Sequence, residues 1–183
     1  KYEKFHPYLV STSNLEVSDF TCDLYFKFHS PFKILYVGRI DLTKGILETI
    51  DAIFKLKEMN ILCHYNIVGW DDTGDKNIQV LKNKVNELNL DELVNFCGKK
   101  PQGNVLNSFY KDSDIFICAS YHESLPRTIF ESMANSTSVI ATKVGSIPLE
   151  LQHNVNSILI NPKVSSDIVE SVKILINNFE LRK

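Results

Sequence analysis

Short apolar runs that end at a glycine recur along this chain, and they constrain its fold more than any other feature. Residues 33–37, 61–68 and 94–97 are such runs, and they are followed by Gly38, Gly69 and Gly98. Segments with apolar residues at helical spacing lie between them, an alternation typical of βα units around a buried parallel sheet. Ligands of such sheets bind outside the carboxyl ends of the strands, where glycine lets backbone amides approach an anion. The sequence therefore predicts an α/β protein with a binding site at that edge.

The same pattern assigns the individual elements from residue 33 onward. We expect a three-layer α/β/α fold with a mainly parallel six-stranded sheet, its strands at 33–37, 63–68, 94–97, 114–119, 138–141 and 157–160. We expect helices at 46–58, 76–88, 104–111, 126–134 and 166–179, the fourth with Pro126 at its first position and the last capped by residues 165–167. Residues 1–30 do not follow the repeat. We expect them to end a preceding domain or to link two domains, and residues 31–183 to form the ligand-binding domain.

Composition limits the class of partner. The chain has 183 residues, of which 44% are hydrophobic and 23% charged, and its formal net charge is −2. That balance is typical of one soluble globular domain, and it gives no basic excess that would favour nucleic acid as a partner. The cysteines form no C-x-x-C pair, and we expect them to be reduced, which favours a cytoplasmic location. No apolar run reaches the length of a transmembrane helix, and the amino terminus does not resemble a signal peptide.

The loop from Gly38 to Gly45 is the first candidate site. A strand, a glycine and then a helix amino terminus place unpaired N–H groups where they can bind an anion, and Arg39 and Lys44 add two full charges. The alternative interpretation is a surface turn with two solvated cations. The G-x-G-x-x-G pattern is missing at every strand end, which disfavours a nicotinamide or flavin enzyme.

The second candidate site is the segment 120–131, which follows the expected strand 114–119. Glu123 falls in the loop at the carboxyl end of that strand, and Glu131 lies within the helix that begins at Pro126. Carboxylates at these two places can accept hydrogen bonds from the vicinal hydroxyls of a sugar and of a ribose. Arg127 sits in the first helical turn, where a bound anion or solvent would offset its repulsion from the helix dipole. The alternative is a loop acid and a solvated helix acid.

Other polar residues give weaker signals. The histidines show no metal-ligand spacing, and only His122 falls near the expected cleft, where we expect a hydrogen-bonding or structural role. Asp71, Asp72 and Asp75 follow Gly69, and we interpret them as a solvated turn. The sequence predicts no metal site.

Taken together, the motifs resemble the carboxyl-terminal, nucleotide-sugar-binding domain of retaining glycosyltransferases with the GT-B fold, known as glycosyltransferase group 1 or family 4. The resemblance runs from about Lys33 to the end of the chain and rests on residues 37–39, 44–45, 67–69, 94–98, 120–126, 131–134, 139–142 and 145–148. It implies a Rossmann-like domain that is one half of a GT-B fold. The chain departs from the family pattern at Ser136, Ser138, Leu149 and residues 156–157, which concern the back wall of the cleft and sugar specificity.

The resemblance also implies a role for each matching position. Arg39 and Lys44 would bind the donor diphosphate, the loop with Lys99 the nucleobase, and Glu131 the ribose, while Glu123 would lie beside the donor sugar. The implied donor-binding set is Gly38, Arg39, Lys44, Lys99, Ser124, Leu125, Pro126, Arg127, Thr128 and Glu131, and the implied catalytic set is Glu123, Arg39 and Lys44. The family transfers a sugar with retention of configuration and ordinarily without a metal ion or other cofactor.

The expected function is therefore donor binding in a glycosyltransferase that uses a nucleotide-diphosphate sugar of the UDP or GDP type. The acceptor would be a glycan or a lipid-linked molecule, and its binding domain should precede residue 1, so this part alone is expected to be inactive. The resemblance is compatible with a cytoplasmic protein or one peripheral to the inner membrane face. Two alternatives are a non-catalytic nucleotide- or sugar-binding module, and another GT-B enzyme such as an epimerase or phosphorylase.

Overall fold

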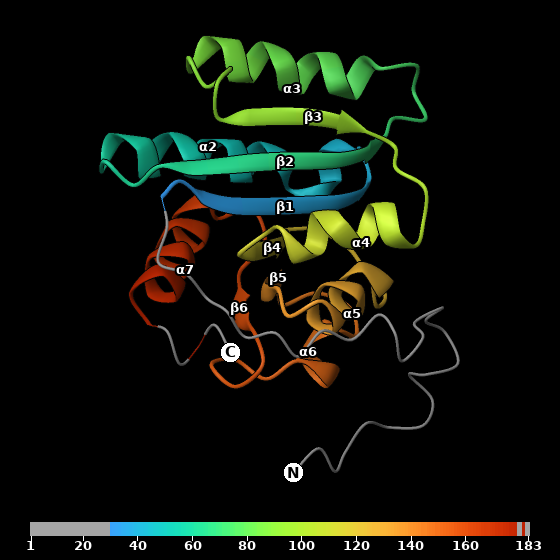
Figure 1. The fold of residues 1–183 in the computed structure, drawn as a ribbon, viewed down its shortest axis with the longest axis vertical. Helices are drawn as coiled ribbons and strands as arrows, with labels where there is room; N and C mark the ends of the chain where they lie inside the picture. Colours follow the sequence, from blue (N-terminus) through green and yellow to red (C-terminus); the bar gives the residue numbers. More distant parts are fainter. Residues whose placement is uncertain (1–29, 179–180, 182–183) are drawn as a thin grey trace.

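A computed structural model of the chain describes residues 30–178 and residue 181. Its centre is a six-stranded sheet, parallel throughout, with the strand order β3-β2-β1-β4-β5-β6 (Figure 1). The strands are β1 (Phe32–Arg39), β2 (Cys63–Trp70), β3 (Val94–Gly98), β4 (Ile115–Cys118), β5 (Ser138–Thr142) and β6 (Ile158–Ile160). The predicted α/β/α fold class is confirmed.

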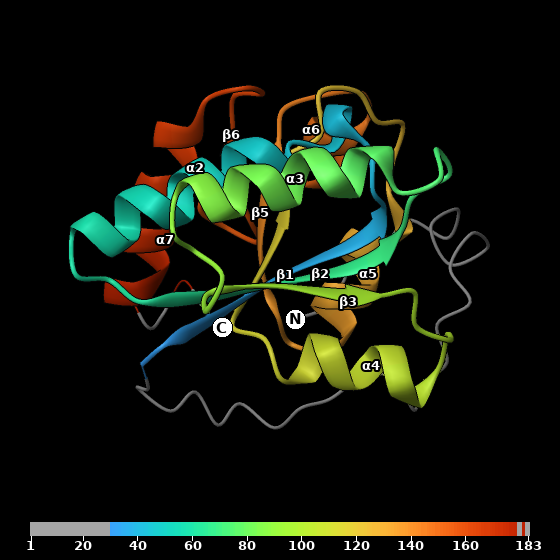
Figure 2. The ribbon, with the colours of Figure 1, turned by 90° about the horizontal axis from the view of Figure 1, so that it is seen from above.

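Helices cover both faces of this sheet. The long ones are α2 (Ile46–Glu58), α3 (Lys76–Glu87) and α7 (Ser165–Asn177), and the shorter ones are α4 (Asn104–Lys111), α5 (Arg127–Ala134), α6 (Ile147–Glu150) and the 3-10 turn η2 (Leu42–Lys44). Figure 2 shows α2 and α3 on one side of the sheet and α4 on the other. Helix α7 packs beside α2, and α5 beside α4.

Alternation along the strands builds a separate apolar core on each face. On β1, Ile34 and Tyr36 belong to the core under α2 and α7, whereas Leu35 belongs to the core that includes Leu106 and Ile129 of α4 and α5. Successive side chains of a strand point to opposite faces, so a strand covered on both faces is apolar at every position. This is the reason that the strands appear in the sequence as continuous apolar runs.

The strand order places the site. From β1 the chain winds outward through β2 to β3, and it then returns to β4 and winds the other way through β5 to β6. The connections after the neighbouring strands β1 and β4 leave in opposite directions along the sheet. A crevice therefore opens between the carboxyl ends of these two strands, because no crossover helix covers it. The turn after β1 and the loop after β4, which carry the two candidate sites, therefore lie at the same crevice.

Several element boundaries differ from the prediction. Strands β1 and β2 pair residue by residue from Phe32 with Cys63 to Arg39 with Trp70, so Gly38 and Gly69 lie within the ladder instead of after it. Pro126 is the N-cap of α5 instead of its first residue. Helix α6 was not predicted because a single helical turn has too few residues to show a period.

The predicted cap of α7 is wrong. The helix begins at Ser165 with Val164 as its N-cap and has no side-chain cap. The carboxylate of Asp167 instead accepts hydrogen bonds from the backbone and side chain of Asn161, at 3.0 and 2.9 Å. Asp167 thus ties the first turn of α7 to the end of β6.

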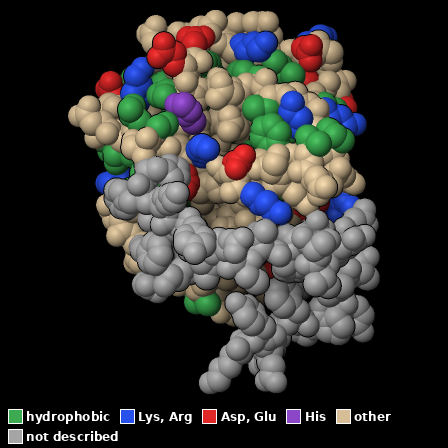
Figure 3. All heavy atoms as spheres, in the orientation of Figure 1, with side chains coloured by type: hydrophobic (Ala, Val, Ile, Leu, Met, Phe, Trp, Pro, Cys, Tyr) green, Lys and Arg blue, Asp and Glu red, His purple; other side chains and the backbone are tan. Residues whose placement is uncertain are grey.

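The proposed segment 1–30 lies outside the described residues except for its last position and stays a prediction. Within the described part of the chain, no helix combines the length and apolar character that crossing a membrane requires. On the coloured part of the face in Figure 3, basic and acidic side chains are interspersed instead of forming one patch of a single sign.

Gly45 fixes how the turn after β1 meets the loop after β4. It has a φ of +69°, and a Cβ at this position would lie 2.0 Å from the carbonyl oxygen of Ala119. Glycine alone allows both this conformation without strain and this close approach. The turn that carries Lys44 therefore packs directly against the end of β4.

We predict that Gly45→Ala destabilises the chain far more than Gly74→Ala. Gly74 has the same φ of +69°, but a Cβ there would meet nothing within 4 Å, so it is a matched control for backbone strain alone. We expect Gly74→Ala to cost about 1 kcal/mol of unfolding free energy. Gly45→Ala should cost about 1–3 kcal/mol more, because the backbone must move away from Ala119. Urea denaturation measures both, and equal losses would contradict the packing role of Gly45.

Candidate functional site

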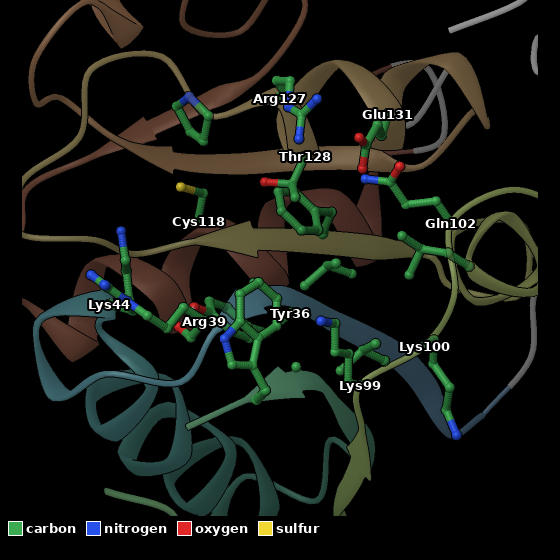
Figure 4. A pocket seen from close by; sticks show the side chains of 18 of the residues that line it. Tyr36, Arg39, Lys44, Lys99, Lys100, Gln102, Cys118, Arg127, Thr128 and Glu131 are labelled. Carbon is green, nitrogen blue, oxygen red and sulfur yellow. Dashed lines mark hydrogen bonds between the residues drawn. The ribbon is translucent and has the colours of Figure 1, made fainter. Parts of the chain in front are cut away.

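A cavity of about 720 Å³ opens at the carboxyl edge of the sheet. Its walls come from the ends of β1, β2 and β4, the loop after β3 and the first turns of α5. Figure 4 shows Arg39 and Lys44 at one end of this cavity and Glu131 and Gln102 at the other, with Arg127 between the ends. The cavity therefore joins the two candidate sites into one elongated pocket.

The structure brings most of the predicted site residues to this cavity. Those that line it are Gly38, Arg39, Lys44, Lys99, Glu123, Pro126, Arg127, Thr128 and Glu131. Ser124 and Leu125 do not line it. The Ser124 carbonyl instead accepts a hydrogen bond of 2.9 Å from the amide of Ser146, which fastens the Glu123 loop to the turn before α6.

Lys44 and Glu123 form an ion pair inside the cavity. Their Nζ and Oε1 atoms are 2.6 Å apart, and the side chains are only 19% and 16% exposed. The Ser120 hydroxyl donates to the same Glu123 oxygen at 2.8 Å. These two donors hold the Glu123 carboxylate in one position. The ion pair likewise holds Lys44, which lines the pocket.

A hydrogen bond from Tyr36 fixes the backbone of Arg39. The buried Tyr36 hydroxyl donates to the Arg39 carbonyl at 2.6 Å, and burial raises the pKa of Tyr36 well above its ordinary value, so this donor stays protonated. The Arg39 guanidinium lies 4.0 Å from Asp41 and 3.8 Å from Asp72, and its side chain is 51% exposed. Both distances are long for hydrogen bonds. The guanidinium is thus poised to bind an incoming anion.

Asp41 is committed to the local turn. Its carboxylate accepts hydrogen bonds from the amide and the hydroxyl of Thr43, at 2.8 and 2.6 Å. These hydrogen bonds from Thr43 lower the pKa of Asp41. The N-cap therefore fixes the 3-10 turn that presents Lys44.

Helix α5 directs its amino end at the cavity. Arg127 is its first residue, and no side chain caps it within the described part of the chain. The orphan N–H groups of a first helical turn carry partial positive charge. Among the described residues the lining has five cationic side chains (Arg39, Lys44, Lys99, Lys100, Arg127) against three carboxylates (Asp72, Glu123, Glu131). In a chain whose formal net charge is −2, this local excess of cationic groups favours the binding of an anion.

Glu131 lies on α5 at the opposite end of the cavity from Lys44 (Figure 4). Its Oε2 accepts a hydrogen bond of 2.8 Å from the Tyr110 hydroxyl of the neighbouring helix α4. A carboxylate held in this way can still accept hydrogen bonds through its remaining lone pairs. This end of the cavity therefore suits a ligand with hydroxyl groups.

Trp70 and the loop after β3 together form one wall of the cavity. Trp70, at the end of β2, lines the cavity, and the Lys99 ammonium lies 4.9 Å from the centre of its ring. The indole N–H donates to Asp72 at 2.8 Å. A cation near the ring and a hydrogen bond at its edge hold the indole in place.

Sequence reasoning missed several cavity residues. The polar and aromatic ones are Tyr36, Trp70, Asp72, Lys100, Gln102, Phe116 and Ser120. The end-of-strand rule that located Arg39 could also have located Trp70, which directly follows Gly69. Nothing in the sequence indicates Tyr36, because a tyrosine within an apolar run is typical of a core residue.

The remaining candidates lie elsewhere. His122 does not line the cavity. Asp71 is a structural group, since it accepts hydrogen bonds from the Thr73 amide and hydroxyl and from the amides of Asn77 and Ile78 in α3. Desolvation opposes ionisation of Asp71, but these hydrogen bonds hold its pKa well below the ordinary value. No cluster of three or more His, Cys, Asp or Glu side chains in the described residues could hold a metal ion.

The cysteines of the described segments are free thiols, and Cys22 lies outside these segments. Cys63 and Cys118 are buried, and Cys97 is partly buried. Burial raises the pKa of Cys118, on the cavity floor, to about 11 and that of Cys63 to about 12. These two thiols are therefore uncharged near neutral pH and behave as small apolar groups.

Comparison with known proteins identifies the family. The model of the glycosyl transferases group 1 family matches residues 25–183. The amylovoran biosynthesis glycosyltransferase AmsK of Erwinia amylovora is 30% identical over 153 residues, which cover 80% of this chain and 36% of AmsK. The crystallised C-terminal domain of a glycosyl transferase group 1 family protein, LpcC of Francisella tularensis, is 33% identical with a TM-score of 0.73, covering 82% of this chain and 78% of that domain. Sucrose-phosphate synthase of Thermosynechococcus elongatus, at 22% identity, shares the fold with a TM-score of 0.80 over 92% of this chain and 43% of the synthase.

The chain belongs to the glycosyl transferases group 1 family. Its fold is the Rossmann-like domain found at the carboxyl end of these GT-B proteins, so the resemblance read from the motifs is confirmed. The chain spans little more than a third of the curated relatives that it matches, 36% of AmsK and 37% of a Methanocaldococcus jannaschii glycosyltransferase.

We predict a measurable coupling between Lys44 and Glu123. Lys44→Met and Glu123→Gln should each destabilise the chain, because each leaves the other partner less well compensated in a mostly buried place. The double variant should lose about 1 kcal/mol less than the two single losses together. Urea denaturation of the four proteins gives this difference. Strict additivity would mean that the pair is not formed in solution.

Proposed function

We propose that this chain is the donor-binding domain of a glycosyltransferase that transfers a sugar from a nucleotide-diphosphate sugar to a glycan or a lipid-linked acceptor. One observation carries the proposal: Arg39, Lys44 and the amino end of α5 face a single cavity whose other end contains Glu131. This order of groups matches the order of diphosphate and ribose in such a donor, and Glu123, which pairs with Lys44, would then lie beside the sugar.

The cationic end would bind the diphosphate and assist its departure. When the bond between sugar and diphosphate breaks, negative charge grows on the leaving oxygens. Preorganised cations and helix amides stabilise that charge more in the transition state than in the ground state. Arg39, Lys44 and the amides of Arg127 and Thr128 are groups of this kind, and with them no metal ion is needed. We therefore propose a metal-independent reaction.

The other groups would select the rest of the donor. Glu131 would accept hydrogen bonds from the ribose hydroxyls, and the loop with Lys99, beside Trp70, would hold the nucleobase. Glu123 would lie next to the donor sugar while keeping Lys44 in place, since the two form the 2.6 Å ion pair. Retention of the anomeric configuration is proposed from family membership alone. The residues do not indicate it, because the two glutamates would recognise the donor instead of flanking the reacting carbon.

Related structures support a nucleotide donor. Anabaena HepE has been crystallised with UDP and with UDP-glucose, and it is similar to this chain with TM-scores of 0.75 and 0.76 at 22% identity. Proteins described as D-inositol 3-phosphate glycosyltransferases also match, the one from Corynebacterium jeikeium at 25% identity. These complexes support a donor of the UDP type. We propose the alternative of a GDP-type donor, and a cytoplasmic protein that acts at the inner membrane face when its acceptor is lipid-linked, from the family resemblance.

Catalysis would need more than this chain. Since the relatives are more than twice as long, we propose that an acceptor-binding domain precedes residue 1 and that this domain alone turns over little or no donor. Binding of the donor, in contrast, should persist in the isolated chain, because its cavity already contains the groups described above.

We predict that the chain binds UDP or GDP and that Arg39→Ala and Lys44→Ala each weaken this binding about 10- to 100-fold. Isothermal titration calorimetry measures the affinities. Lys55→Ala is the matched control, since Lys55 is an exposed cation on α2 that contacts Ser165 and not the cavity, and it should leave binding unchanged. Absence of binding by every nucleotide and nucleotide sugar tested would refute the proposal.

We further predict that Glu123→Ala weakens binding of the nucleotide sugar more than binding of the free nucleotide. The reason is that Glu123 is proposed to lie beside the sugar, which the free nucleotide lacks. Parallel titrations with UDP and UDP-glucose, or their GDP counterparts, compare the two effects. Equal effects on both ligands would remove the assignment of Glu123 to the sugar.

A further inference from the structure

The hydrogen bond between Tyr110 and Glu131 links a fully buried side chain to the cavity. Tyr110 is 0% exposed and comes from α4, whereas Glu131 comes from α5 and lines the cavity. The Tyr110 hydroxyl donates to Oε2 of Glu131 at 2.8 Å. Tyr110 does not itself line the cavity, so any effect on a ligand must act through Glu131.

Packing holds Tyr110 in one position. Its ring lies against Phe116 of β4, with the ring centres 6.0 Å apart and the planes at 57°. Its carbonyl accepts a hydrogen bond of 2.8 Å from the hydroxyl of Thr137, just before β5. The phenol therefore projects from a rigid part of the core toward Glu131.

The hydroxyl is a permanent donor. Burial, together with the nearby negative charge of Glu131, raises the pKa of Tyr110 well above its ordinary value. A neutral phenol has one hydrogen to donate, and here it goes to Oε2. Within the described part of the chain, Tyr110 is the one donor to this carboxylate, so the second oxygen, Oε1, is available for a ligand.

We propose that Tyr110 is a positioning residue that orients the Glu131 carboxylate so that Oε1 accepts a hydrogen bond from a ribose hydroxyl. This inference rests on the proposed function. It predicts that the pair Tyr110–Glu131, and not Glu131 alone, makes the site prefer ribonucleotides to nucleotides that lack the ribose hydroxyls.

The test compares UDP with 2′,3′-dideoxy-UDP, or the GDP pair if GDP binds better, by calorimetry. Tyr110→Phe keeps the ring and removes the donor. We expect it to weaken UDP binding about three- to tenfold. Binding of the dideoxy nucleotide should not change. Tyr65→Phe is the control, because Tyr65 is equally buried at 0% exposure and does not line the cavity, and the hydroxyl that bonds to Glu131 is that of Tyr110. The ratio of the two affinities in this variant should equal that of the wild type.

A general loosening of the fold would lower both affinities together, whereas a positioning role changes only their ratio. In the Glu131→Ala background, Tyr110→Phe should cause no further change of the ratio, since the group through which it acts is missing. An unchanged ratio in Tyr110→Phe, or a further fall in the double variant, would overturn the inference.

Glu131→Gln gives an answer that does not depend on the folding of Tyr110→Phe. The Tyr110 donor should take the amide oxygen of this variant and leave its NH₂ group facing the ligand. The preference for UDP should then fall below that of the wild type, because a neutral NH₂ donor replaces the charged acceptor that faces the ribose. A preference equal to that of the wild type would contradict the positioning role. If the wild-type chain binds neither UDP nor GDP, the proposed function fails and this inference fails with it. If it binds the ribonucleotide and Glu131→Ala lowers the preference, only the role of Tyr110 is in question.

Discussion

The contact between the turn after β1 and the loop after β4 is the constraint on which the site depends. Gly45 lets the turn lie directly against the Ala119 carbonyl, and the Thr43 carbonyl accepts a 2.8 Å hydrogen bond from the amide of Tyr121. The Lys44–Glu123 ion pair closes the same junction on the cavity side. Because β1 and β4 are the strands where the winding of the sheet reverses, this junction sits at the mouth of the crevice.

The junction also explains how a chain with a small net negative charge can present a cationic pocket. Its acids near the cavity are engaged: Asp41 binds the Thr43 amide and hydroxyl, Glu123 binds Lys44 and Ser120, and Glu131 binds Tyr110. The amino end of α5 has no side-chain cap, and the half-exposed Arg39 approaches Asp41 and Asp72 only at 4.0 and 3.8 Å. A diphosphate entering the cavity would thus meet donors that the fold has already oriented.

Much of this could be predicted from the sequence, and the exceptions have physical reasons. The apolar runs located the strands because strands buried on both faces are apolar at every position, and the end-of-strand rule located Arg39 and Glu123. The predicted cap of α7 was wrong because Asp167 bonds to Asn161, a partner that tertiary structure supplies. Tyr110 gave no signal, since a tyrosine in a short amphipathic helix is the same in sequence whether or not its hydroxyl meets a carboxylate across the fold.

A crystal structure of this chain with UDP or GDP tests the central claim most directly. We expect the diphosphate within hydrogen-bonding distance of Arg39, Lys44 and the first amides of α5, and the ribose hydroxyls next to Glu131. A nucleotide bound at another surface, or one whose phosphates contact neither Arg39 nor Lys44, would contradict the proposed donor site.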